Sequence, residues 1–184
     1  ISEKVGVSPK DIHAYVMGEH GDSEFVPWSN ANIALKRLDM YLTKDEMKQI
    51  EDDVRNSAYE IINRKGATYY GIGMCLVRIT NAILGDEKTI MTVSGYDEKN
   101  DVYVGLPYVI DKNGIHDKVY VELTEDESQK LVNSINIIKE LNNYVWHDKK
   151  SNIPIDAYNH QLDALGYVMW DLYGKKSTKT SIRI

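Results

Sequence analysis

The stretch DIHAYVMGEHGDSEFVPWS, residues 11–29, places a histidine between two glycines at the end of a mostly apolar segment. The apolar residues before the histidine predict a strand over residues 9–17. Imidazole is the side chain whose unperturbed pKa lies nearest neutral pH, so His20 suits proton transfer. Gly18 and Gly21 leave room for a substrate and for unusual backbone angles. A loop histidine beside two turn glycines explains the same spacing, and spacing alone favours that simpler interpretation.

Working outward from this stretch, the sequence predicts a series of helices. A short helix is expected over Pro27–Leu35. Thr43 and Glu46 form a capping box, a hydroxyl followed three residues later by a carboxylate, which marks the start of a long helix. Gly66 breaks this helix, and the next helix is expected to end at Gly85. Apolar residues follow helical spacing on the two long helices: Met47, Ile50, Val54, Ala58, Ile61, Ile72, Leu76, Ile79 and Ile83.

Three strands are predicted next, because β-branched and aromatic residues dominate Thr89–Val93, Val102–Val109 and Lys118–Leu123. An Asn-Gly pair at 113–114 is a strong turn signal between the last two. A second capping box, over residues 124–127, starts another helix. The expected class is α+β, with long helices packed on a mostly antiparallel sheet and an appended C-terminal helix.

Composition restricts the class of protein further. The chain has 184 residues and a net charge of −6, which argues against a general nucleic-acid-binding surface. Its one cysteine, Cys75, permits no disulfide within the chain and fits a reducing, cytoplasmic setting. No apolar run is long enough to span a bilayer, and no signal peptide is recognisable. The chain begins at Ile1 rather than at methionine, so we expect a fragment or a processed product.

Three segments of the chain resemble one family of enzymes. Residues 11–29 closely resemble the catalytic-histidine region of the L-lactate dehydrogenases, within the lactate/malate dehydrogenase family. Lys65–Tyr70 (KGATYY) resembles the family's substrate-side helix start, and Asp101–Pro107 (DVYVGLP) with Asn-Gly-Ile at 113–115 resembles its late β-hairpin. The resemblance covers residues 1–143, which correspond only to the second, substrate-binding half of such an enzyme.

The resemblance implies roles for three residues. His20 matches the group that exchanges a proton with the C2 oxygen of lactate or pyruvate, while the nicotinamide of NAD exchanges hydride with C2. Thr68 matches the residue beside the substrate methyl group, and a hydroxyl that caps the following helix is the alternative. His13 matches a histidine that binds the phosphate of the effector fructose 1,6-bisphosphate at a subunit interface. An ordinary strand histidine at an interface is the alternative for His13.

Several parts of the family's active site have no counterpart in this sequence. The resemblance places the aspartate that orients the imidazole, the arginine that binds the substrate carboxylate and the Gly-rich nucleotide loop before the matched half. No G-x-G-x-x-G motif follows a predicted strand here. We therefore expect this chain to be inactive alone. Because this half buries surface in the family's oligomers, the helices over residues 43–84 are expected to drive self-association.

Residues 144–184 follow the end of the dehydrogenase resemblance. A helix is expected from near Asp156, and residues 144–184 resemble the C-terminal end of the nuclease domain of phage terminase large subunits, with matches at Tyr144–Trp146 and within residues 155–167. Asp163 matches one carboxylate of that family's divalent-metal cluster, although arginine is frequent there where Gly166 stands. Two-metal hydrolysis needs several carboxylates from different strands. A helix that packs by its apolar face is therefore the favoured interpretation of this segment.

Three hypotheses about function follow. The preferred hypothesis is the substrate-binding half of an NAD-dependent L-lactate dehydrogenase, which acts on lactate and pyruvate and forms a homo-oligomer. The second is a nuclease-related fragment that cleaves DNA with a divalent metal held in part by Asp163. The third is a non-catalytic, chimeric module in which truncated parts of two proteins are joined.

Overall fold

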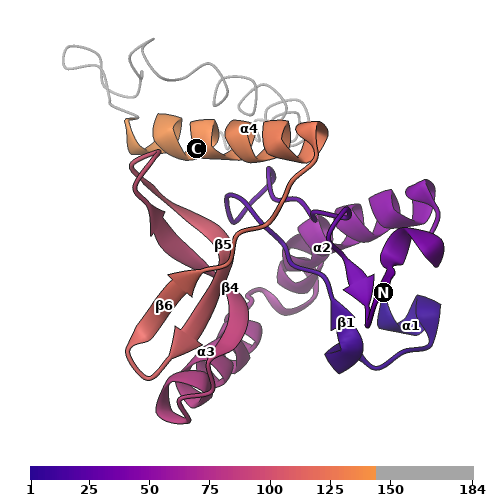
Figure 1. The fold of residues 1–184 in the computed structure, drawn as a ribbon, viewed down its shortest axis with the longest axis horizontal. Helices are drawn as coiled ribbons and strands as arrows, with labels where there is room; N and C mark the ends of the chain where they lie inside the picture. Colours follow the sequence, from indigo (N-terminus) through magenta and orange to yellow (C-terminus); the bar gives the residue numbers. More distant parts are fainter. Residues whose placement is uncertain (144–184) are drawn as a thin grey trace, which may run out of the picture. The chain divides into compact units, whose positions relative to one another are not determined.

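The computed structural model describes residues 1–143. Residues 1–135 form one compact unit, and the described residues 136–143 lie outside it. Figure 1 shows the elements along the chain. They are α1 (Ser2–Val5), a 3₁₀ helix (Pro9–Asp11), β1 (Ile12–His13), β2 (Asn32–Ile33), β3 (Lys36–Arg37), a second 3₁₀ helix (Leu38–Met40), α2 (Lys44–Lys65), α3 (Tyr69–Leu84), β4 (Thr89–Asp97), β5 (Val102–Asp111), β6 (Gly114–Lys118) and α4 (Glu125–Asn142).

The larger sheet is antiparallel, with the strand order β4-β5-β6. Alternate side chains of the central strand, β5, are buried with at most 4% of their surface exposed: Val102, Val104, Leu106, Tyr108 and Ile110. This alternation is that of a strand with one face against the core. The α+β class, with helices beside a mostly antiparallel sheet, is confirmed.

The third strand of this sheet begins earlier than predicted. β6 starts directly after the two-residue turn that follows β5, at Gly114, whose φ of 97° is a conformation that glycine favours. The predicted strand over Lys118–Leu123 is wrong, because the chain leaves the sheet after its first residue. Val119 then donates a hydrogen bond to the Pro107 carbonyl at 3.0 Å. The turn therefore determines where β6 begins to pair with β5. The β-branched residues that follow Lys118 do not determine it.

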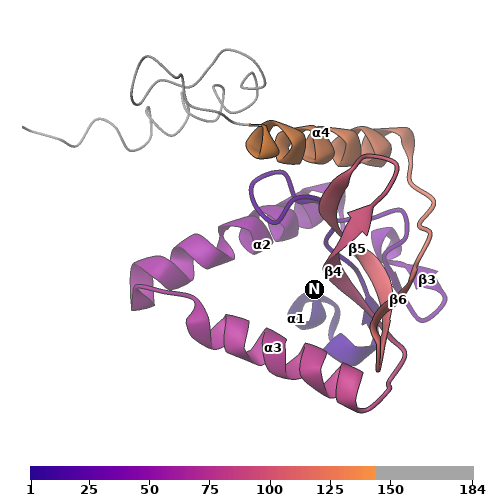
Figure 2. The ribbon, with the colours of Figure 1, turned by 90° about the vertical axis from the view of Figure 1, so that its left-hand side faces the viewer.

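The two long helices begin and end where the sequence predicts. At the start of α2, Glu46 N donates to Thr43 Oγ1 at 3.3 Å and Thr43 N donates to Glu46 Oε2 at 2.9 Å, which completes the capping box. Gly66 ends α2 with a φ of 80°, and Gly85 follows the last residue of α3. Figure 2 shows α2 and α3 diverging from the short connection between them.

The predicted strand over residues 9–17 is confirmed as a strand only at Ile12–His13, which form β1, and is wrong over residues 9–11. Ser8 and Pro9 favour a tight turn here, since the Ser8 hydroxyl accepts a hydrogen bond from Lys10 N and proline suits the first helical position. A 3₁₀ helix results, and only β1 follows it as a strand. Met17 then makes an isolated bridge to Phe25.

The predicted helix over Pro27–Leu35 is also wrong. Residues 28–30 form a turn, and a hairpin made of β2 and β3 follows. Ala34 lies in the hairpin turn with a φ of 53°, which is incompatible with a right-handed helix. The amide of Ser29 donates to the Glu127 carboxylate at 2.9 Å, a tertiary contact that local sequence does not reveal.

The strands β1, β2 and β3 form a second, smaller antiparallel sheet in that order. A second cluster of buried side chains lies at this sheet, and it packs against apolar residues of the N-terminal segment and α2. The buried members are Ala31, Ile33, Leu38, Leu42 and Ile50. Of the helices in residues 1–143, none combines the length and the apolar character needed to cross a membrane. The predicted C-terminal helix, the terminase-like segment and Asp163 lie outside the described residues.

Candidate active site around His20

Residues 18–24 form a closed loop, named here the His20 loop. At its base, Met17 and Phe25 exchange two backbone hydrogen bonds of 2.8 and 3.0 Å, and both side chains are buried. Gly18 exchanges a second such pair with Gly105 of β5, both at 2.9 Å. Reciprocal bonds of this kind are those of an antiparallel ladder. The base of the loop is thereby fixed to the larger sheet.

Position 18 requires glycine for two reasons, the local backbone conformation and the closeness of a neighbouring side chain. Its φ is 105°, and a Cβ added there would lie 2.5 Å from Ser134 Oγ. The predicted unusual backbone angle is therefore confirmed at Gly18. The predicted room for a substrate at Gly18 is wrong, because Ser134 fills that space. Gly105 allows an equally close approach, since a Cβ there would lie 2.8 Å from the Gly18 carbonyl oxygen.

Ser134, in the middle of α4, holds the other side of the His20 loop. Glu19 N donates a hydrogen bond of 2.5 Å to the hydroxyl of Ser134, which is fully buried. Ser23 Oγ lies 3.0 Å from the same hydroxyl and donates to Glu19 Oε2 at 2.8 Å. Sequence analysis missed Ser134, because its partners lie more than one hundred residues away along the chain.

The imidazole of His20 projects from this fixed loop with 99% of its side chain exposed. Its Nδ1 lies 3.9 Å from Glu24 Oε2, within reach of an ion pair but too far for a hydrogen bond. Burial raises the pKa of Glu24, and the charges of His20 and Arg55 partly offset that rise. Glu24 was not predicted as a partner of His20. The nearer acidic residues bind elsewhere: Glu19 accepts from Ser23, and Asp22 accepts from a tyrosine of α2.

α2 holds the exit from the His20 loop. Arg55 Nη2 donates to the Glu24 carbonyl oxygen at 3.2 Å, while Nη1 of the same guanidinium pairs with Asp52 at 3.0 Å. One turn earlier on α2, Glu51 accepts a hydrogen bond of 2.8 Å from the indole of Trp28. The backbone that leaves the loop is therefore attached to α2.

The carboxylate of Glu127 joins α4 to the segment that follows the loop. It accepts hydrogen bonds from the Ser29 amide at 2.9 Å and from the Ser29 hydroxyl at 2.6 Å. It also accepts from Thr124 N at 3.0 Å, which completes the second predicted capping box. Burial raises the pKa of Glu127, but the hydrogen bonds from Ser29 and Thr124 outweigh burial and lower the pKa below its usual value.

Thr68 occupies the N-cap position of α3, as the KGATYY motif predicts. Its side chain makes no capping hydrogen bond, so the alternative of a helix-capping hydroxyl is wrong. The backbone carbonyl of Thr68 accepts a hydrogen bond from Ile72 N at 3.2 Å. The hydroxyl and methyl groups of Thr68 are thus not committed to the helix start.

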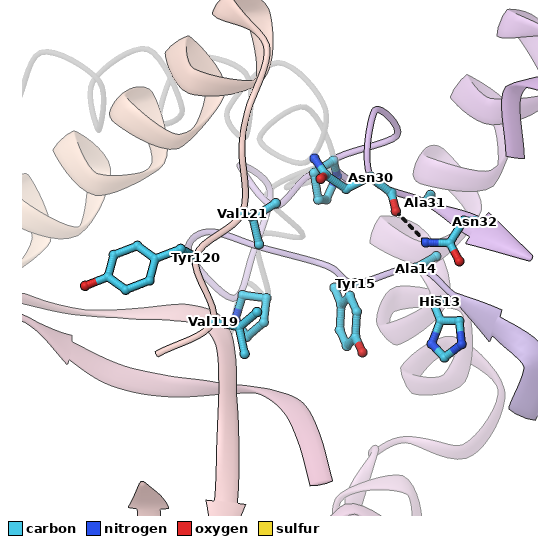
Figure 3. A pocket seen from close by; sticks show the side chains of 11 residues that line it. His13, Ala14, Tyr15, Asn30, Ala31, Asn32, Val119, Tyr120 and Val121 are labelled. Atoms are coloured by element: carbon cyan, nitrogen blue, oxygen red, sulfur yellow. Dashed lines mark hydrogen bonds between the residues drawn. The ribbon is translucent and has the colours of Figure 1, made fainter. Parts of the chain in front are cut away.

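His13 lies on β1 and lines a cavity of about 170 Å³, shown in Figure 3. Asn32, its cross-strand neighbour, lines the same cavity together with Tyr15 and Asn30. Figure 3 shows Tyr120 directed away from these residues. Among the residues that line this cavity, within the described part of the chain, only His13 can carry a positive charge. His20 and Thr68 do not line it, so the three predicted site residues are not gathered in this cavity.

Residues 1–143 contain no candidate metal-binding site. In this range, no group of three or more His, Cys, Asp and Glu side chains is placed to hold a metal ion. The predicted metal ligand Asp163 lies outside the range, so its role stays a prediction.

A histidine-bearing loop joined to an antiparallel sheet, together with two long helices, defines an α+β domain. Residues 1–147 match the family described as the lactate/malate dehydrogenase α/β C-terminal domain. This chain belongs to that family.

Known relatives agree with the assignment. L-lactate dehydrogenase 2 of Bacillus cereus is 44% identical over 150 residues, which cover 76% of this chain and 48% of the relative. A lactate dehydrogenase from a Medee basin deep-sea metagenome library has a solved structure with a TM-score of 0.72, at 43% identity over 76% of this chain and 48% of its own. The minor L-lactate dehydrogenase of Enterococcus mundtii gives a TM-score of 0.73 at 36% identity, over 77% of this chain and 48% of its own. The chain spans about half the length of these relatives.

Proposed function

We propose that this chain is the substrate-binding half of an L-lactate dehydrogenase and that His20 transfers the proton. The observation that carries the proposal is the contrast within His20: its loop is bonded to β5 and α4, whereas its imidazole is 99% exposed. A fixed backbone with a free ring suits a group that must meet a substrate. In pyruvate reduction the imidazolium gives its proton to the ketone oxygen, and in lactate oxidation the neutral ring takes it from the hydroxyl.

NAD is the cofactor that this function requires, and the described residues do not fit it. A dinucleotide site is built on parallel strands with a Gly-rich turn before a helix. In residues 1–143, every strand pairing within the two sheets is antiparallel. NAD exchanges the hydride, and we assign its binding to the other half of the enzyme.

The surface of α3 supports a protein that works in a larger assembly. A helix with apolar residues on most sides is ordinarily buried, and large exposed apolar patches mark interaction sites. α3 nevertheless exposes most of its apolar side chains: Tyr69, Tyr70, Ile72, Met74, Leu76, Val77 and Leu84. We assign this surface to contacts within a homo-oligomeric dehydrogenase that contains both halves.

Thr68 is the proposed contact for the methyl group of the substrate. Its side chain is not used to cap α3, which leaves it available to a ligand. A short side chain at this position keeps the pocket small, which favours pyruvate over larger 2-oxo acids.

His13 is the proposed contact for fructose 1,6-bisphosphate. A protonated imidazole beside the cavity of Figure 3 suits a phosphate group. No other residue lining the cavity in the described part of the chain carries positive charge, so any further cations for a bisphosphate have to come from outside this lining.

Joining this chain to the nucleotide-binding half of the Bacillus cereus relative tests the proposal. The joined protein is expected to reduce pyruvate with NADH, and His20→Gln should lower kcat roughly a hundredfold or more. His116→Gln is the matched control, because His116 is also exposed but pairs with Asp111 on the hairpin at 3.2 Å. A folded, NADH-binding protein that does not turn over pyruvate, or one in which His20→Gln is as active as the control, would contradict the proposal.

A further inference from the structure

We propose that Ser134 is a positioning residue for His20, because its buried hydroxyl holds the His20 loop in one conformation. The proposal rests on the function proposed above. Ser134 touches neither substrate nor cofactor in this account, since its surface is fully buried between α4 and the loop. It acts through the backbone immediately before His20, by accepting the hydrogen bond of Glu19 N at 2.5 Å.

The direction of each hydrogen bond follows from the chemistry of the groups. Glu19 carries an ionisable carboxylate that accepts, so Ser23 gives it the one hydroxyl proton it has, over 2.8 Å. The contact of 3.0 Å between the two serine oxygens must then use the proton of Ser134. Ser134 accepts from Glu19 N and donates to Ser23, and Ser23 donates to the Glu19 carboxylate. These bonds form a closed ring in which each strengthens the next.

The local sequence gives no structural reason for this serine in α4. Serine is neutral to unfavourable in a helix interior, where its hydroxyl competes with the backbone. A buried hydroxyl without hydrogen-bond partners lowers the stability of the fold. The Ser134 hydroxyl avoids this cost through its contacts to Glu19 N and Ser23 Oγ, both in the His20 loop. The fit is also close, because a Cβ on Gly18 would lie 3.2 Å from Ser134 Cβ. Ser134 is therefore matched to the loop.

Amide exchange and relaxation measured by NMR on the full 184-residue chain test the positioning directly. Ser134→Ala should raise the exchange rate of the Glu19 amide by roughly tenfold or more, because its acceptor is gone. Backbone order parameters from Glu19 to Asp22 should fall, while the Gly105 amide on β5 stays protected. Ser128→Ala, an exposed serine on the same helix, is the matched control and should change neither.

Ser23→Ala provides a second variant that leaves α4 untouched. It removes the middle hydroxyl of the ring but keeps the acceptor of Glu19 N. We expect the Glu19 amide to remain protected while order falls at Asp22 and Ser23. Ser134→Ala with unchanged exchange at Glu19, or with exchange raised equally at Glu19 and Gly105, overturns the proposal. A Ser23→Ala chain whose backbone order parameters at Asp22 and Ser23 stay unchanged also overturns the proposal.

A kinetic measurement on the joined protein connects the loop to the reaction. Ser134→Ala should lower kcat for pyruvate by roughly tenfold to a hundredfold with little change in KM, since a displaced imidazole still permits binding. Ser128→Ala should keep both constants. If the joined wild-type protein has no activity, the proposed function fails while the NMR result still decides whether Ser134 positions the loop. If the joined protein is active and Ser134→Ala leaves its kcat unchanged, the proposal is overturned.

Discussion

At the scale of single residues, the motif around His20 predicts the special backbone of Gly18, which the structure confirms. The roles of His20 and Thr68 rest on the motifs alone and stay predictions. Glu24 is four residues from His20, a spacing that offers a local signal for the pair. Ser134 offers no such signal, because its partners lie across the fold and its own helix would accept many residues in its place.

Gly18→Ala is expected to destabilise the chain by about 2 to 4 kcal/mol, since it adds backbone strain to a collision with Ser134. Urea unfolding followed by circular dichroism measures the loss. Gly66→Ala is the control, because Gly66 also has a positive φ but a Cβ there meets nothing within 4 Å. Equal losses for the two variants would show that Ser134 does not crowd position 18.

Glu127 makes stability depend on pH in a defined direction. Its pKa is lowered by folding, so its contribution is present above the ordinary value of 4.5 and disappears as pH falls through the lower folded value. The free energy of unfolding should therefore fall more steeply below pH 4.5 in the wild type than in Glu127→Gln. Urea titrations from neutral to acidic pH measure both slopes, with the exposed Glu125→Gln as control. Parallel slopes for wild type and Glu127→Gln would refute this assignment.

At the scale of elements, predictions succeed where the signal is local. α2 and α4 begin at capping boxes, and glycines end α2 and α3 as expected. Predictions fail where tertiary contacts or tight turns decide. Glu127 binds the turn at Ser29, where a helix was expected, and Gly114 starts β6 before the most β-branched residues are reached.

Thr43→Ala is expected to cost about 1 kcal/mol, because it removes the hydroxyl of the capping box at the start of α2. Thermal or urea unfolding measures the change. Thr80→Ala, at an exposed position inside α3, should be neutral or slightly stabilising, since alanine has the higher helix propensity. A Thr43→Ala chain as stable as Thr80→Ala would mean that the capping box contributes nothing.

At the scale of the whole molecule, this chain has the fold of one half of its relatives and exposes apolar surface on α3. Sequence periodicity predicted apolar residues on this helix but not that they stay exposed, because periodicity does not identify what covers a face. The resemblance to a half-enzyme supplied that expectation. The two halves of the proposed active site are therefore expected to meet only on assembly.

The exposed surface of α3 should make the isolated chain self-associate. Leu76→Glu replaces an exposed apolar residue with a charge and should shift the sedimentation profile toward monomer. Ser128→Glu, an exposed change on α4, adds the same single negative charge and serves as the control. A wild-type chain that sediments strictly as a monomer would contradict this use of the surface.

Turnover on mixing tests the central claim most directly. This chain and the separately produced nucleotide-binding half of the Bacillus cereus relative are assayed with NADH and pyruvate, first alone and then together. The account predicts that neither half turns over pyruvate alone, that the mixture does, and that His20→Gln abolishes the activity of the mixture. Turnover by this chain alone at the level of an intact dehydrogenase, or activity of the mixture that survives His20→Gln, would contradict it.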